Sequence, residues 1–188
     1  MHPLIQHAAP ELAVSQWFNT KTPLSLAALK GRPVFLHTFQ LLCPGCVSQA
    51  LPQVKRIERV FAQSDLEIIG IHTVFEHHAA MSPVTLQAFL HEYRIASPVG
   101  VDQPDETTGI PVTMQRFGLQ GTPSSVLIGR DGTILNSSFG VEDDIAIGAR
   151  IAMALSAPMP EHVATALDDG KSDCEVGRCA VPSLAGSA

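Results

Sequence analysis

The sequence has no surplus of positive charge, since 12 lysines and arginines stand against 18 aspartates and glutamates and the formal net charge is -6. Such a chain offers no basic field to attract the phosphate backbone of a nucleic acid or an anionic membrane surface. It also lacks any apolar run approaching the ~20 residues that a membrane-spanning helix needs. We therefore expect neither nucleic acid nor a membrane as a partner.

Signals and cofactor loops are missing as well. The first residues, MHPLIQHAAPEL, have neither the charged nor the apolar region of a secretory signal. We therefore expect a cytoplasmic protein, or a periplasmic one if a leader has been removed. No glycine-rich dinucleotide-binding loop follows any predicted strand, so no organic cofactor is expected.

Length and composition fit one globular domain with an extension at each end, because the chain has 188 residues of which 45% are hydrophobic. Residues 1–11 contain Pro3 and Pro10 and no periodicity, which predicts a flexible N-terminal lead. Residues 12–156 carry the periodic patterns of the predicted domain. Residues 157–188 have few large apolar side chains, which predicts a mobile C-terminal tail.

Short apolar or alternating runs predict the strands of an α/β domain. Residues 34–39 and 66–72 are mainly apolar runs typical of interior strands, and they would be parallel if the helix between them is a crossover. Asp131-Gly132 is a strong signal for a hairpin between two later strands. Residues 98–112 are rich in Pro, Asp and Gly and carry no predicted element. The predicted strands are residues 12–18, 23–26, 34–39, 66–72, 124–129 and 133–139.

Three segments predict helices. Apolar residues recur at spacings of three and four from residue 44 to residue 61, and Pro52 is expected to kink that helix. Ser82-Pro83 has the pattern of an N-cap followed by proline at the first helical position. The acidic residues 142–144 suit the first turn of a closing helix.

The chain has only four cysteines, and they form two close pairs: Cys43 with Cys46 and Cys174 with Cys179. A chain of this size does not need disulfides as a scaffold. A bridge across so short a loop would also restrain the unfolded chain little. The spacing therefore points to chemistry or to metal binding.

The first pair lies in CPGC, between a predicted interior strand and a predicted helix. Backbone N–H groups and the dipole at a helix start favour the thiolate of Cys43, which is the predicted nucleophile. Cys46 lies one turn further on, where it can resolve a mixed disulfide. Metal ligation and inert thiols are the alternatives, although zinc sites usually need four ligands and no second CxxC or HxxxH lies nearby.

With LKGRPVFLHTFQLLCPGC and GTPSSVLIGRDGTIL, residues 12–156 resemble the thioredoxin-like superfamily, most closely its TlpA/ResA-type redoxin branch. The resemblance implies a central mixed sheet flanked by helices, an inserted helical segment and thiol-disulfide oxidoreductase activity. It also implies that Pro123, after Thr122, is a cis-proline whose neighbouring backbone meets the substrate. An ordinary trans turn proline is the alternative.

Several residues depart from the family pattern. Leu42 stands where members often have Trp before the first cysteine, and Gln49 replaces an acid found after the second cysteine in ResA-type proteins. His37 stands where thioredoxins carry a buried acid, so it could handle a proton, or it could be a hydrogen-bonded core histidine. Leu36 and Gln40 occupy the proline and threonine positions of the peroxiredoxin motif, so peroxide reduction through that motif is unsupported.

The second pair, Cys174 and Cys179, lies in the acidic predicted tail. An extended chain from Ser156 to Cys174 would reach up to ~60 Å at about 3.3 Å per residue, enough to touch any point of the domain. We hypothesise a tethered redox relay to the CPGC pair. A metal site in the tail and exposed thiols without a role are the alternatives, because C-x4-C is a weak pattern.

Histidines gather in HTVFEHH, where His72, Glu76, His77 and His78 follow the end of a predicted strand. A copper chaperone of the Sco type, also thioredoxin-like, uses two cysteines and a histidine, which makes metal handling the alternative function. The Sco pattern spaces its cysteines by three residues, whereas this chain spaces them by two. A solvated polar loop is the simpler interpretation of these histidines.

The sequence thus predicts thiol-disulfide exchange. Cys43 attacks, Cys46 resolves, Thr122 and Pro123 present backbone to the substrate, and His37 is a candidate proton handler. The expected partners are a protein or small-molecule disulfide and an unidentified electron donor. In a reducing cytosol, the domain is expected to reduce disulfides rather than install them.

Overall fold

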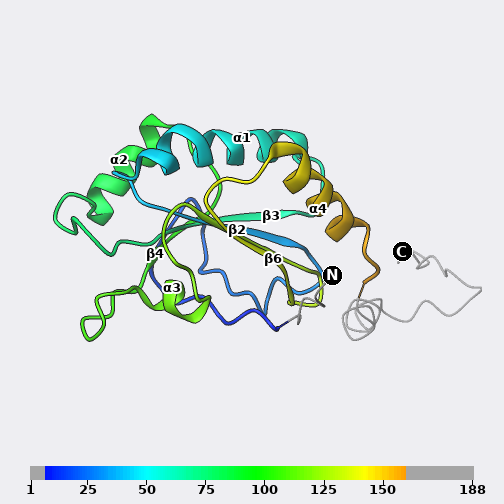
Figure 1. The fold of residues 1–188 in the computed structure, drawn as a ribbon, viewed down its shortest axis with the longest axis horizontal. Helices are drawn as coiled ribbons and strands as arrows, with labels where there is room; N and C mark the ends of the chain where they lie inside the picture. The colour runs from blue at the N-terminus through cyan, green and yellow to red at the C-terminus, as the bar shows by residue number, and fades with distance from the viewer. Residues whose placement is uncertain (1–6, 160–188) are drawn as a thin grey trace, which may run out of the picture.

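The computed structural model describes residues 7–159, which fold around a six-stranded mixed sheet (Figure 1). The strand order is β1-β4-β3-β2-β5-β6. β2 pairs in parallel with β3, and β3 with β4, whereas the other three pairings are antiparallel. The strands are β1 (Val14–Phe18), β2 (Val34–Phe39), β3 (Glu67–His72), β4 (Val99–Asp102), β5 (Ser124–Ile128) and β6 (Ile134–Phe139).

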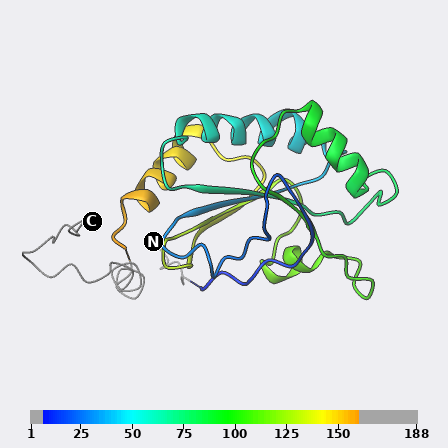
Figure 2. The ribbon, with the colours of Figure 1, turned by 180° about the vertical axis from the view of Figure 1, so that it is seen from behind.

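Helices cover both faces of the sheet, as predicted. One face packs against α1 (Leu51–Val60), α2 (Pro83–Glu92) and α4 (Asp144–Ser156). The other face is covered by the short α3 (Val112–Arg116) and by the N-terminal segment, which runs beneath the sheet in Figure 2. β2 lies inside the sheet with every residue buried, so whatever follows it is held by a rigid core.

The segment after β2 is helical from Pro44 to Val60, and the irregularity expected at Pro52 takes the form of a π-helical turn, η1 (Cys46–Ala50). Proline has no N–H to donate to the carbonyl four residues back, so the preceding turn is free to widen. The N–H of Leu51 accordingly donates to the carbonyl of Cys46, five residues earlier.

The helix caps follow the sequence signals. The Ser82 hydroxyl accepts a hydrogen bond from the N–H of Thr85, with Pro83 at the first position of α2. The Asp143 carboxylate caps α4 by accepting the N–H groups of Ile145 and Ala146. All three acidic residues at this point have defined places: Asp143 is the cap, Asp144 is the first helical residue, and the carboxylate of Glu142 accepts a hydrogen bond from Asn136.

Two sequence predictions about strands are corrected. Residues 23–26 form no strand, because the Glu11 carboxylate accepts the N–H groups of Leu26 and Ala27 and holds a turn there. β4 was not predicted, since glycine and aspartate in Val99–Asp102 suggest a loop. Gly100 is in fact a packing residue, because a Cβ there would lie 2.8 Å from a methyl of Val14 on β1.

The N-terminal segment contacts the β5–β6 hairpin. Ala8 forms a bridge with Thr133, and the N–H of Ala9 donates to the carbonyl of Gly132 over 2.8 Å. Residues 7–11, which the sequence assigns to a flexible lead, thus share backbone hydrogen bonds with the domain.

Candidate active site

The CPGC segment begins at the carboxyl end of β2, after a turn at residues 40–42. The turn is held by the N–H of Cys43, which donates to the carbonyl of Gln40 over 3.3 Å. Helical hydrogen bonding starts with the N–H of Val47, which donates to the carbonyl of Cys43 over 3.1 Å. Cys43 therefore lies at the N-terminal end of the crossover helix, as the sequence predicts.

Cys43 is the accessible member of the reduced pair, because it is half-buried while Cys46 is fully buried. Its Sγ accepts the backbone N–H of Cys46 over 3.3 Å and lies 3.5 Å from the carbonyl oxygen of Thr122. The Cys43 thiol donates to that carbonyl oxygen, so the two hydrogen bonds together fix the position of its sulfur. This geometry suits Cys43 to nucleophilic attack.

Cys46 has the opposite environment. The pKa of its thiol is raised to about 12, chiefly by burial and then by a hydrogen bond to Cys43. The backbone N–H of Gln40 and the hydroxyl of Thr122 also hydrogen-bond this sulfur, and both oppose the rise in pKa. Cys46 is therefore a protonated thiol at neutral pH, with two hydrogen-bond donors placed to stabilise its thiolate when one forms.

Thr122 and Pro123 lie against the dithiol, and the peptide bond between them is cis. The Pro123 ring lies 3.5 Å from the position that a Cβ on Gly45 would occupy. The cis-proline expected from the resemblance is therefore present, and it packs against the CPGC segment.

His37 lies on β2 and is buried, with its ring stacked on Phe39 at a centroid distance of 5.7 Å. Neither ring nitrogen has a hydrogen-bond partner within residues 7–159, so the expectation of a hydrogen-bonded core histidine is not met. Burial lowers the pKa of His37 to about 4, so the ring is neutral and weakly basic at neutral pH. Its role as a proton handler stays a prediction.

The histidines after β3 are not gathered around the cysteines. His72 is buried on β3 beside Phe39, whereas His77 and His78 are exposed. Over the described part of the chain, no three His, Cys, Asp or Glu residues are grouped to hold a metal ion. Cys174 and Cys179 lie outside the described residues.

Gln40 is the site residue whose role sequence reasoning missed. Its side chain is 1% exposed, and its Nε2 donates to the Thr122 hydroxyl over 3.3 Å. The sequence marks Gln40 only as a departure from the peroxiredoxin motif. A polar residue three positions before the first cysteine, at the end of an apolar strand, is the signal that could have identified it.

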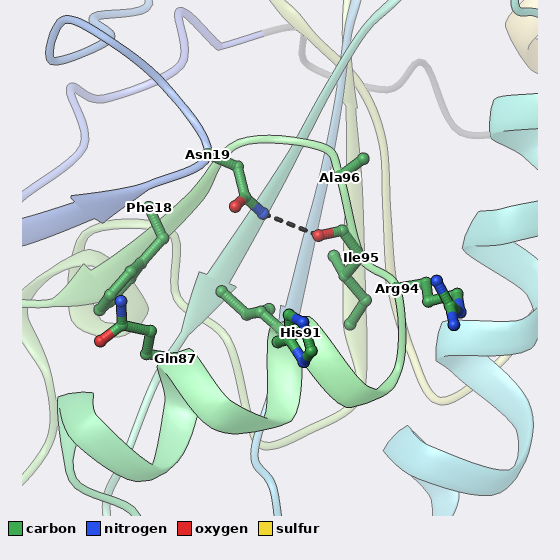
Figure 3. A pocket seen from close by; sticks show the side chains of 8 residues that line it. Phe18, Asn19, Gln87, His91, Arg94, Ile95 and Ala96 are labelled. Atoms are coloured by element: carbon green, nitrogen blue, oxygen red, sulfur yellow. Dashed lines mark hydrogen bonds between the residues drawn. The ribbon is translucent and has the colours of Figure 1, made fainter.

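A cavity of about 700 Å³ lies away from this site, between the end of β1 and α2 (Figure 3). Asn19 crosses it by donating to the carbonyl of Ile95 over 2.9 Å. Its lining contains neither CPGC cysteine and neither residue of the cis-proline segment. The dithiol is therefore a surface site beside the cis-proline loop rather than part of this cavity.

A mixed sheet with helices on both faces, and a dithiol between its central strand and a crossover helix, defines a thiol-disulfide oxidoreductase with the thioredoxin-like fold. Residues 5–137 match the model of the AhpC/TSA family, and the chain belongs to that family. The predicted resemblance to thioredoxin-like redoxins is thereby confirmed.

Solved structures agree with this assignment. A thioredoxin-like superfamily protein is 45% identical, with a TM-score of 0.79 and coverage of 81% of this chain and 99% of that chain. A thiol-disulfide isomerase from Corynebacterium glutamicum is 42% identical, with a TM-score of 0.75 and coverage of 80% and 98%. The exposed lipoprotein thioredoxin of Streptococcus pneumoniae shares the fold at 18% identity, with a TM-score of 0.57 and coverage of 77% and 98%. No curated protein matches the chain.

Within residues 7–159, no helix has both the length and the apolar character needed to cross a membrane. The cytoplasmic location expected from the first residues of the sequence stays a prediction.

Proposed function

We propose that the protein exchanges electrons with disulfide substrates through Cys43 and Cys46. The Cys43 thiolate attacks one sulfur of a substrate disulfide, which forms a mixed disulfide and releases the first substrate thiolate. Cys46 loses its proton and attacks the Cys43 sulfur, which forms the Cys43–Cys46 disulfide and releases the second substrate thiolate. The substrate gains two electrons, and an external thiol reductant returns them to the pair.

The asymmetry of the two sulfurs is the observation that supports this function best. Cys43 is accessible and accepts the N–H of Cys46 over 3.3 Å, whereas Cys46 is 0% exposed. An incoming disulfide can therefore reach Cys43 first, and Cys46 is protected until the mixed disulfide has formed. This order is the one that the two-step exchange requires.

We further propose that the substrate is a polypeptide disulfide. Leu42, beside the nucleophile, is 57% exposed, and Phe139 is 61% exposed. Phe139 pairs with Ser124 across the β5–β6 ladder and covers Gly121, which places it next to the cis-proline segment. Exposed apolar side chains around a reactive sulfur favour an extended chain with apolar residues over a small polar disulfide.

The mixed disulfide provides the experiment for this function. Cys46→Ser, with Cys43 reduced, should trap a mixed disulfide between Cys43 and a substrate polypeptide that carries an intact disulfide, visible as a dithiothreitol-sensitive band, while the native chain catalyses insulin reduction. Cys43→Ser should do neither. Insulin reduction that survives in Cys43→Ser would reject the assignment.

We propose in addition that Cys174 and Cys179 pass electrons to the CPGC pair. Their spacing and the length of chain that tethers them support this relay. The variant carrying both Cys174→Ser and Cys179→Ser should turn over more slowly with a protein reductant while its Cys43 reacts normally with a small disulfide. Unchanged turnover and an unchanged reduction potential would reject the relay.

A further inference from the structure

Gln40 connects three parts of the active site. Its carbonyl accepts the N–H of Cys43, its N–H hydrogen-bonds the sulfur of Cys46, and its side-chain Nε2 donates to the hydroxyl of Thr122. The side chain is buried, and its Oε1 has no hydrogen-bond partner within residues 7–159. Buried polar atoms in proteins are nearly always hydrogen-bonded. The amide of Gln40 makes one side-chain hydrogen bond, through Nε2, so we look to that bond for its role.

The hydrogen bond from Gln40 to Thr122 affects the direction in which the Thr122 hydroxyl proton points. A hydroxyl group has one proton to donate and can accept hydrogen bonds from other donors. When Gln40 Nε2 donates to the Thr122 oxygen, the hydroxyl proton is left for another acceptor. The sulfur of Cys46 is the acceptor already hydrogen-bonded to that hydroxyl.

We propose that Gln40 is a positioning residue for the resolving step, because it turns the Thr122 hydroxyl proton toward the Cys46 sulfur. This inference rests on the proposed exchange function. As Cys46 gives up its proton and attacks the sulfur of Cys43, negative charge develops on the Cys46 sulfur. The oriented hydroxyl stabilises that charge, because hydrogen bonds to charged groups are stronger than those to neutral ones.

Few other ionisable groups could change the stability of the Cys46 thiolate. The titratable group that interacts with its sulfur is Cys43. His37 and His72, which flank Phe39 on neighbouring strands, are neutral near pH 7 because burial lowers the pKa of each to about 4. A change at Gln40 should therefore reach Cys46 through Thr122.

Release of thionitrobenzoate from Ellman's reagent separates the two chemical steps. The full-length chain carrying Cys174→Ser and Cys179→Ser, reduced and mixed with substoichiometric reagent, should release one equivalent when Cys43 attacks. A second equivalent should follow when Cys46 displaces the bound thionitrobenzoate. The second rate, measured against pH, reports how readily Cys46 becomes a thiolate.

In that background, Gln40→Met should slow the second phase about tenfold at each pH below the pKa of Cys46, the effect of one hydrogen bond to a charged group. The first phase should stay within about twofold, which also shows that the variant is folded. Thr122→Val should slow the second phase in the same way, and adding Gln40→Met to it should cost nothing more. With Thr122→Ser, which retains a hydroxyl, Gln40→Met should again slow the second phase.

Three results would overturn the inference: an unchanged second phase in Gln40→Met, equal slowing of both phases, or an equally large effect of Gln40→Met in the Thr122→Val background. Release of a single equivalent by the parent chain is a different result, because it rejects the exchange function itself.

Discussion

At the scale of single residues, the space for the buried ring of His37 is set by one glycine. Gly70 on β3 pairs with His37 on β2, and a Cβ at Gly70 would lie 3.0 Å from Nε2 of His37 and 3.1 Å from a methyl of Val99. Contacts this short force neighbours to move in a packed interior. A buried imidazole fits on β2 because the neighbouring strand has no side chain at that place.

Gly70→Ala should therefore lower the free energy of unfolding by about 1–3 kcal/mol, the usual cost of overpacking a core. Gly148→Ala is the matched control, since Gly148 lies within α4 and nothing stands within 4 Å of its Cβ position. That control should raise the free energy of unfolding by roughly 0.5–1 kcal/mol, because alanine favours a helix interior. Urea denaturation of both variants measures the difference, and equal effects would contradict the packing argument.

The burial of His37 gives stability a pH dependence. The folded ring takes up a proton only below about pH 4, whereas in the unfolded chain it does so below its ordinary pKa of 6.5. The unfolded state thus binds more protons between these values, so stability is fully present above pH 6.5 and falls as pH drops toward 4.

We expect the loss to be on the order of 3 kcal/mol for this histidine. His37→Leu should flatten the dependence of the unfolding free energy on pH in that window, while His72, whose pKa is also lowered to about 4, keeps its own share. The same slope in the variant and the parent would show that the folded ring is protonated normally.

At the scale of elements, the N-cap residue of α4 stabilises the first turn of the closing helix. The carboxylate of Asp143 accepts two N–H groups that would otherwise lack partners at the helix start. Asp143→Ala should lower the free energy of unfolding by about 1 kcal/mol, whereas Asp143→Asn, which retains an acceptor, should cost little. Thermal denaturation of the pair tests this, and equal losses would mean that charge rather than capping matters.

The elements that the sequence predicts correctly are those with local causes. The strand of residues 34–39 coincides with β2, and the hairpin, the caps and the helix start were all marked by local signals whose physical cause acts within a few residues. β4 was missed because Gly100 serves a contact with Val14, which lies far away in the sequence. Residues 23–26 were misassigned because a distant carboxylate, Glu11, holds their turn.

The active site shows the same difference between local signals and contacts that join distant residues. The positions of Cys43, Cys46 and the cis-proline follow from a motif and a family resemblance. The contact between Gln40 and Thr122 does not, because it joins residues from two loops that only the completed sheet brings together. Sequence spacing carries no information about which way a hydroxyl proton points.

At the scale of the whole molecule, exposed apolar side chains near the nucleophile should decide which substrates are used well. Leu42→Ser and Phe139→Ser should each raise KM for insulin by about threefold to tenfold, because each removes apolar area that a polypeptide would cover. The rate with Ellman's reagent should stay within about twofold. Val60→Ser is the control, since Val60 is 70% exposed and is the last residue of α1, at the opposite end of the helical segment from Cys43. Equal effects on both substrates would contradict a polypeptide-binding surface.

The most direct test of the account is the equilibrium of the chain carrying Cys174→Ser and Cys179→Ser with glutathione buffers of graded composition. Alkylation and intact mass should show one two-electron transition, in which Cys43 and Cys46 lose their hydrogens together, and Cys43→Ser should abolish it. A pair that stays reduced across the whole range, or a transition that survives Cys43→Ser, would contradict a CPGC dithiol that works by reversible disulfide formation.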